Sequence, residues 1–325
     1  MSADVMPNPQ LSFGRLALLG LSSVVLSASF IMSIFAPFPI ALAVIMYGRL
    51  RGYAIGALGA MVCFVLASLL FKDLVLFGFY LCVLLFGFGI AEIVQRGIRP
   101  VRGLVIFGLL FLTVISSLGG FFLKSQNLSA EQYIVQQIEQ SSDKLEEQKK
   151  LIKQSESTDI EALTLLDNPK LLAKELIKTF PGYIFIAMFI MLWFNMFMVL
   201  KSRRLLFAGN DYPHSEHDLL RFQVPFAWIS LLVVGLVLAT WGQDLGQLWY
   251  EDAGMNIIKC LGLFYFFQGF GVLSDFLSFL GIVGFWRSLL VMSIIFLGST
   301  VVAMAGLLDN WFEFRKYFVK KTKID

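Results

Sequence analysis

The sequence predicts an all-α protein: a polytopic transmembrane helical bundle, with an extramembrane helical hairpin inserted near its middle. Two observations predict this class. Of the 325 residues, 58% are hydrophobic and only 15% are charged, whereas about a quarter of the residues in a soluble domain are charged. The mean hydropathy is +0.76, and apolar runs of about 20 residues, enough to cross a bilayer, recur along the chain.

Eight apolar runs reach the length of a membrane span, and two shorter runs lie between them. The full-length runs are residues 16–35, 53–71, 74–94, 103–123, 181–200, 223–241, 256–273 and 288–308. The runs 38–47 and 275–285 are shorter than a span and are interpreted as half-helices, re-entrant pieces or tilted short crossings. The first run continues beyond its small residues, so we expect an uncleaved helix.

Lysines and arginines gather in alternate connections, and this pattern predicts the orientation. The basic connections 48–52, 95–102 and 201–222 and the C-terminal tail are expected in the cytoplasm. The tail reaches the cytoplasm only if one more crossing is added, and the run 275–285 is predicted to supply it. The expected location is therefore the inner (cytoplasmic) membrane, crossed many times, with both termini in the cytoplasm.

Residues 124–180 interrupt the apolar pattern with polar sequence. Ser129 and Gln132 have the spacing of a capping box, and an apolar residue every turn then predicts an amphipathic helix. Asn168 followed by Pro169 predicts the start of a second helix. The insert holds 8 lysines and 10 acids, so its charge does not indicate nucleic acid. Its charged face is either merely solvated or a docking surface.

Two amides fall inside apolar runs, where polar side chains are costly. Asn195 lies in "WFNMFMV" and Gln268 in "YFFQGFG". With the aromatic residues Trp193, Tyr265 and Phe267, they are predicted to line a pocket for a small, partly apolar ligand. The alternative is that each amide joins two helices, an interaction of about 0.6 to 2 kcal/mol.

No pattern of residues indicates catalysis or a resident cofactor. The sequence has no phosphate-binding loop and no nucleophile elbow. His214 and His217 are spaced for one helix face, but no cysteine or HExxH motif accompanies them, so no metal site is predicted. The three cysteines lie in apolar segments and predict no disulfide. The protein is predicted not to be an enzyme, and any ATPase that drives it would be a partner.

The stretch "GLLDNWFEFRK", residues 306–316, carries the last apolar run into a charged and aromatic segment. Continued as one helix, it places acids and lysines on one side and aromatic residues on the other. This pattern predicts an amphipathic tail on the inner membrane surface, with anionic lipid as its partner. Arg315 projects among the aromatic side chains and must snorkel, stack on a ring or find a buried acceptor. The motif residues are Asp309, Phe312, Glu313, Phe314, Arg315 and Lys316.

The same stretch resembles the C-terminal motif of the YybS-like family of bacterial membrane proteins of unknown function. Asn195 followed by Arg203 and Arg204, "RFQVP" at 221–225 and "QGFGV" at 268–272 agree with this resemblance, which spans the whole chain.

A second resemblance covers the first half of the chain. Residues 37–60, "PFPIALAVIMYGRLRGYAIGALGA", are similar to a stretch in the S components of energy-coupling-factor vitamin transporters and in the rod-shape protein MreD. It implies a helical bundle that captures a small molecule for a separate ATPase. Two departures are Met32, in the middle of the Ala28 to Ala36 face where such components have small residues, and the long insert.

These observations divide the chain into four predicted parts: an N-terminal membrane half (1–123), the extracytoplasmic hairpin (124–180), a C-terminal membrane half (181–308) and a cytoplasmic basic tail (309–325). The predicted function is capture or transport of a small solute as an S-component-like subunit with an ATPase partner. The alternative is a non-transporting envelope scaffold that docks partner proteins through its hairpin and tail.

Overall fold

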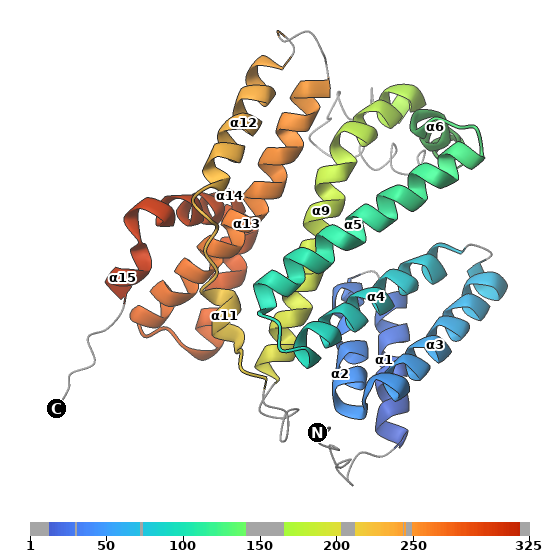
Figure 1. Ribbon diagram of the computed structural model, residues 1–325, viewed down its shortest axis with the longest axis horizontal. Helices are drawn as coiled ribbons and strands as arrows, with labels where there is room; N and C mark the ends of the chain where they lie inside the picture. The colour runs from blue at the N-terminus through green and yellow to red at the C-terminus, as the bar shows by residue number, and fades with distance from the viewer. Residues whose placement is uncertain are drawn as a thin grey trace, which may run out of the picture. The chain divides into compact units, whose positions relative to one another are not determined.

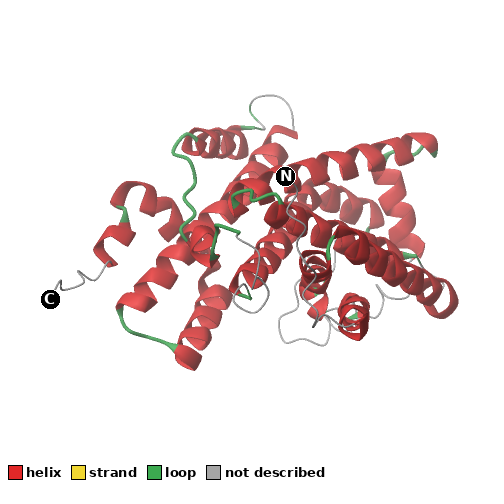
Figure 2. Ribbon diagram, turned by 60° about the horizontal axis from the view of Figure 1, so that its bottom comes forward, coloured by secondary structure: helices red, strands yellow, loops and turns green. Residues whose placement is uncertain are grey.

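The computed structural model describes residues 13–29, 31–71, 74–140, 166–202, 212–242, 244 and 249–318, and every element drawn for them is a helix (Figures 1 and 2). This confirms the all-α class. Within these described ranges, five helices are long and apolar enough to cross a membrane, or six if a bent pair near the C-terminus is one span. The predicted number of eight spans is therefore not confirmed.

The chain forms two compact units that are each discontinuous in sequence. Unit 1 contains residues 1–109, 187–224 and 265–325, and unit 2 contains residues 110–186 and 225–264. Each unit is described by itself below. The four predicted parts are a division by sequence alone, and they stay a prediction.

In unit 1, the first four α-helices form an N-terminal bundle (Figure 1). They are α1 (Phe13–Ala28), α2 (Pro37–Tyr47), α3 (Arg49–Leu66) and α4 (Val75–Gln95). A 3₁₀ turn, η1 (Met32–Phe35), precedes α2, and a π-helical turn, η2 (Ala67–Phe71), follows α3. The predicted span 16–35 thus ends as an α-helix at Ala28.

Helix α2 is the centre of this bundle, because Ile40, Ala41, Ala43 and Val44 are fully buried where it packs against α1, α3 and α4. It corresponds to the short run 38–47, and Pro37 begins it at a position where a helix needs no N–H donor. Gly48, with φ 85°, ends α2 and lets the chain turn directly into α3. A Cβ on Gly52 would overlap the backbone of Val44, so the two helices touch at their main chains.

Both predicted arms of the hairpin begin as expected. Ser129 Oγ accepts from Gln132 N at 3.1 Å, and Gln132 Oε1 accepts from Ser129 N at 2.9 Å, which confirms the capping box before α6 (Ala130–Gln140). Asn168 Oδ1 accepts from Lys170 N and Leu171 N before α9 (Pro169–Lys201). The remainder of the predicted first arm, residues 141–165, lies outside the described residues.

Helix α9 continues the second arm without interruption into the predicted span 181–200. At 33 residues it is about 50 Å long, against about 30 Å for a bilayer's hydrocarbon core. Unit 2 also contains the end of α5 (Pro100–Ser125), whose first residues belong to unit 1.

Helices α12 (Trp228–Trp241) and the first half of α13 (Trp249–Phe279) lie side by side in unit 2 (Figure 1). Close contact depends on small residues: a Cβ on Gly254 would overlap the backbone of Gly235 and Ala239. Helix α12 begins later than the predicted span 223–241, because residues 222–227, which include Pro225, are not helical. Its 14 residues are fewer than a perpendicular crossing needs.

The predicted separate crossing at 275–285 is wrong. Helix α13 runs on to Phe279, and a turn at 280–283 leads into α14 (Gly284–Phe312). Instead, the break lies inside α14, where the axes of the two parts, Gly284–Ile294 and Gly298–Phe312, differ in direction by 96°. Gly298 adopts φ −145° and ψ 34° at this kink, which accounts for the bend because helix geometry fails there.

Both ends of α14 contact the same part of α13. Near its start, Arg287 Nη2 donates to Ser274 Oγ at 2.7 Å, and near its end Asp309 accepts from Gln268 at 3.2 Å. The bent pair is either one broken span or a re-entrant element. The cytoplasmic orientation of the basic tail stays a prediction.

Candidate functional site

The C-terminal motif continues α14 past Leu308 only as far as Phe312, so the predicted single amphipathic tail helix is wrong at Glu313. Glu313 ends α14 in the left-handed region, with φ 45° and ψ 50°. A short helix, α15 (Phe314–Phe318), follows in a new direction. Lys316 forms an ion pair with Glu313 and so spans the corner. The basic residues Lys320, Lys321 and Lys323 lie outside the described residues.

This reversal carries Arg315 back onto α13. Arg315 Nη2 donates to the backbone oxygens of Gln268 at 2.7 Å and Phe222 at 3.2 Å. Its Nε lies 3.5 Å from Asp309 Oδ2, and only 13% of its side chain is exposed. Of the three outcomes predicted for this arginine, the structure has the buried acceptor. One guanidinium thereby joins the end of α14, the middle of α13 and the segment before α12.

Asp309 is the most deeply buried charged group of the network, with a fully buried side chain. Gln268 Nε2 donates to Asp309 Oδ2 at 3.2 Å and to Asn310 Oδ1 at 3.0 Å, and Gln268 Oε1 accepts from Val224 N at 2.8 Å. Asp309 Oδ1 has no hydrogen-bond partner among the described residues. A buried carboxylate with one free oxygen is costly, so Asp309 is a candidate for a role besides packing.

Glycines explain why the motifs "QGFG" and "GLLD" meet. A Cβ on Gly306 would overlap the backbone oxygen of Tyr265, and a Cβ on Gly269 would overlap that of Val302. A Cβ on Gly271 would overlap Leu220 O and lie 2.7 Å from Arg315 Nη2. Only glycine lets these backbones come close enough for Gln268 and Arg315 to reach their partners.

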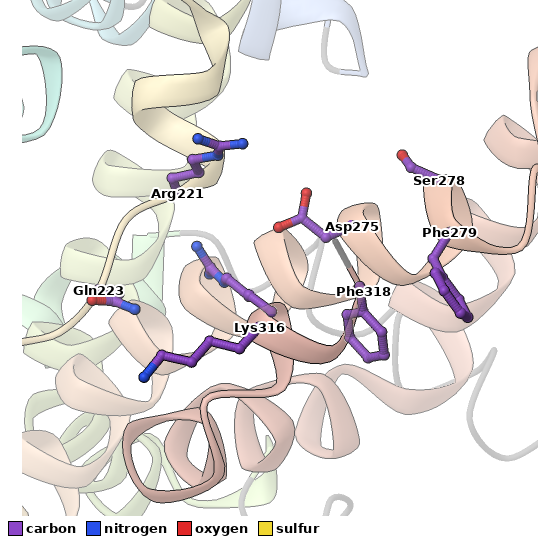
Figure 3. Close-up of a pocket in the computed structure, with 8 residues that line it drawn as sticks. Arg221, Gln223, Asp275, Ser278, Phe279, Lys316 and Phe318 are labelled. Carbon is purple, nitrogen blue, oxygen red and sulfur yellow. The ribbon is translucent and has the colours of Figure 1, made fainter. Parts of the chain in front are cut away.

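A cleft of about 610 Å³ adjoins the network on the side of Arg315 (Figure 3). We call it the C-terminal cleft. It opens between the segment after α11 (Glu216–Leu220), the end of α13 and α15. Its lining consists of Arg221, Gln223, Asp275, Ser278, Phe279, Arg315, Lys316 and Phe318.

Two charged side chains of this cleft lack a hydrogen bond or ion pair within the described part of the chain. No hydrogen bond or ion pair there engages the side chain of Arg221 or that of Asp275, whereas Lys316 pairs with Glu313. Figure 3 shows Arg221 and Asp275 directed into the space between them from different elements. Free charges of opposite sign in one concave site can bind a ligand that carries charged groups.

Burial lowers the pKa of the Arg315 guanidinium, while the carboxylates of Asp309 and Asp275 oppose this shift and Arg221 adds to it. Because an arginine titrates far above neutrality, Arg315 keeps its positive charge. Arg315 therefore acts as a fixed cation between the buried network and the cleft.

The five residues of the predicted pocket do not line this cleft. The rings of Trp193 and Phe267 stack with centroids 4.2 Å apart. Asn195 donates to Ile34 O at 2.6 Å and to Met191 O at 2.7 Å, which links α9 to the turn before α2. Gln268 also joins separate segments, as described above. Tyr265, three positions before Gln268, is buried. Their role in ligand binding stays a prediction.

Sequence reasoning overlooked a bridging amide in unit 2. Asn256 of α13 accepts from Gly182 N at 3.0 Å and donates to Lys178 O at 2.8 Å. In an unbroken helix these two backbone groups of α9 would pair with each other, but Pro181 disturbs the helix between them. A proline inside an apolar helix leaves backbone groups that need a hydrogen-bond partner from another segment. This requirement is the sequence feature from which a bridging side chain such as Asn256 could have been predicted.

The sequence analysis predicts no site role for Arg221 or Asp275. Arg221 lies in the basic connection 201–222, and Asp275 begins the short apolar run 275–285. In the structure, Asp275 lies in the last turns of α13. No sequence pattern indicates that the two lie near each other, because 53 positions separate them.

Comparison with protein families matches residues 16–310 to the family described as "Predicted membrane protein (DUF2232)". No curated protein and no solved structure matches the chain significantly. The resemblances to the YybS-like family and to S components are not confirmed by these comparisons.

Proposed function

Because the chain belongs to the DUF2232 family of predicted membrane proteins, we propose that it is a multi-pass inner-membrane protein that captures a ligand with an anionic group. The capture site is the C-terminal cleft. The ligand is bound and not converted, and both termini lie in the cytoplasm, as the positions of the basic residues suggest.

The observation that carries this proposal is the free guanidinium of Arg221 at the cleft, beside the buried cation Arg315. Arginine offers a planar set of N–H donors that suits carboxylates and phosphates. Two nearby cations favour an anionic group, because each can donate charge-assisted hydrogen bonds to it. The buried network supports the site because it holds Arg315 in place through three contacts.

Binding of inorganic phosphate to the purified full-length chain tests this proposal. In detergent, phosphate is expected to raise the melting temperature, and Arg221→Gln is expected to remove most of that rise. The matched control is Arg99→Gln, since Arg99 is exposed in another basic connection. An equal response to phosphate in the chain with Gln at position 221 would show that the cleft is not an anion site.

The transport step is a further part of the proposal. The resemblance of residues 37–60 to S components supports delivery of the captured solute to an ATPase partner. Purification in mild detergent, followed by mass spectrometry of proteins and small molecules, should then recover an ATPase. Recovery of cell-envelope proteins alone would favour the scaffold instead.

The scaffold is the second candidate because α9 is about 20 Å longer than a hydrocarbon core. Such a helix projects a rigid arm beyond the membrane, on which a partner could dock. Deletion of residues 128–178 should then abolish function in a complementation assay without changing phosphate binding. Full complementation by the shortened protein would rule the scaffold out.

A further inference from the structure

The C-terminal cleft presents charges of both signs. Arg221 and Asp275 line it from separate elements, and neither side chain forms a hydrogen bond or ion pair within the described residues, although the carboxylate of Asp275 lies close enough to Arg315 to favour its charge. A ligand with only negative groups would satisfy Arg221 but would bring its charge close to the carboxylate of Asp275. Such like charges repel. A ligand with one anionic and one cationic group satisfies both.

Apolar surface continues from the cleft along the turn into α14. Phe279 and Phe318 are part of the lining. Just beyond Phe279, Val283 is 72% exposed and Trp286 is 67% exposed. A water-soluble zwitterion has no groups to cover this surface, whereas the acyl chains of a lipid do.

The position along α13 agrees with the headgroup region of a bilayer. Asp275 lies two residues after the end of the apolar run 256–273. Trp311 and Tyr317 are exposed near the cleft in sequence, and such aromatic residues concentrate at the membrane surface. The volume of about 610 Å³ lies in the range of small-ligand sites.

From these observations we propose that the C-terminal cleft binds the headgroup of an amine-bearing zwitterionic phospholipid such as phosphatidylethanolamine. Arg221 would bind the phosphate, Asp275 the ammonium group, and the apolar turn the upper acyl chains. This inference rests on the proposed anion site and names its ligand class.

Competition between lipids tests the inference. The full-length chain is exposed to mixed vesicles of phosphatidylethanolamine, phosphatidylglycerol and phosphatidylcholine, extracted in mild detergent, and analysed by native mass spectrometry. We expect preferential retention of phosphatidylethanolamine over both others, because phosphatidylglycerol lacks a cation and phosphatidylcholine lacks N–H donors. Asp275→Asn should lower the preference over phosphatidylglycerol about tenfold, the ratio that one charge-assisted contact provides.

Four other outcomes would overturn the lipid assignment, and they separate it from the proposed function. If phosphatidylglycerol is preferred, or if Asp275→Asn changes nothing while Arg221→Gln weakens all binding, the ligand is a simple anion and the proposed function stands. If free phosphoethanolamine binds as tightly as the lipid, the source is a soluble solute. If Arg221→Gln affects neither the lipids nor inorganic phosphate, both proposals fail.

The variants are suited to this test because neither Arg221 nor Asp275 holds the described fold together through a hydrogen bond or ion pair. Melting temperatures without ligand should therefore match those of the unchanged protein. Arg99→Gln again serves as the control for a lost surface charge, and it should leave the order of lipid preference unchanged.

Discussion

The N-terminal bundle of α1 to α4 and the C-terminal assembly of α15, α14 and the end of α13 belong to one unit but are stabilised differently. The bundle is filled by apolar side chains around α2, such as Ile40, Val83 and Leu84. Its acid, Glu92, lies at a partly exposed helix end and contacts Arg49, Arg96 and Tyr53. The C-terminal assembly has instead buried an acid, Asp309, with an amide and a guanidinium.

This difference shows that the C-terminal assembly contains a buried charge whose desolvation is unfavourable and which packing alone does not require. A buried ion pair rarely stabilises a protein more than apolar side chains of similar size. Ionisable residues in a membrane protein commonly mark a functional site. The C-terminal assembly, which borders the cleft with its unpaired Arg221 and Asp275, is therefore the better candidate for function, and the N-terminal bundle is the better candidate for a rigid support.

The largest expected effect sharpens this contrast. Asp309→Ala should lower the free energy of unfolding by about 3 to 5 kcal/mol, because it leaves the guanidinium of Arg315 buried without its acid. In the bundle, Ile40→Val should lower it by only about 1 kcal/mol, the usual cost of one buried methylene. Denaturation of the purified chain in detergent measures both.

A double variant separates the ion pair from simple loss of packing. Asp309→Ala combined with Arg315→Ala should cost less than the sum of the two single changes, because neither charge is then left alone. Strict additivity would mean that the two groups do not interact, and the contrast between the regions would lose its basis.

A smaller effect should be common to both regions, since each contains backbones in direct contact. Gly306→Ala and Gly52→Ala are each expected to cost about 1 to 3 kcal/mol, because the added Cβ would overlap Tyr265 in one case and Val44 in the other. Gly262→Ala is the matched control, as no atom lies within 4 Å of its added Cβ. It should be neutral or stabilise the helix by up to about 1 kcal/mol. Equal melting temperatures for all three would contradict the close approach.

The smallest effect concerns the amide that attaches α9 to the turn before α2. Asn195→Ala should cost about 0.6 to 1.7 kcal/mol, the range for hydrogen bonds between membrane helices. Ser117→Ala serves for comparison, because its hydroxyl bonds only to Thr113 O of its own helix. A loss as large as that of Asp309→Ala would place Asn195 in a more demanding role than joining helices.

The sequence by itself determined the features that depend on neighbouring residues. Mean hydropathy predicted an all-helical membrane protein, since composition over about 20 residues decides whether a segment prefers lipid. The Ser129 capping box and the Asn168 and Pro169 helix start were predicted correctly, because a cap contacts residues only two or three positions away. The sequence also identified Arg315 as a side chain that needs a buried acceptor or an aromatic partner.

Only the tertiary structure decided which partners the long-range contacts join. The Gln268 network depends on backbones brought together by Gly269, Gly271 and Gly306. The bend in α14 lies at Gly298, and the chain reverses at Glu313. Helical periodicity continues a helix until another contact outweighs it, so it predicted a straight tail and a separate crossing at 275–285. Hydropathy predicts that a segment prefers lipid, but it does not predict which distant residues pack against that segment. The shared position of Arg221 and Asp275 in one cleft is therefore decided only by the folded chain.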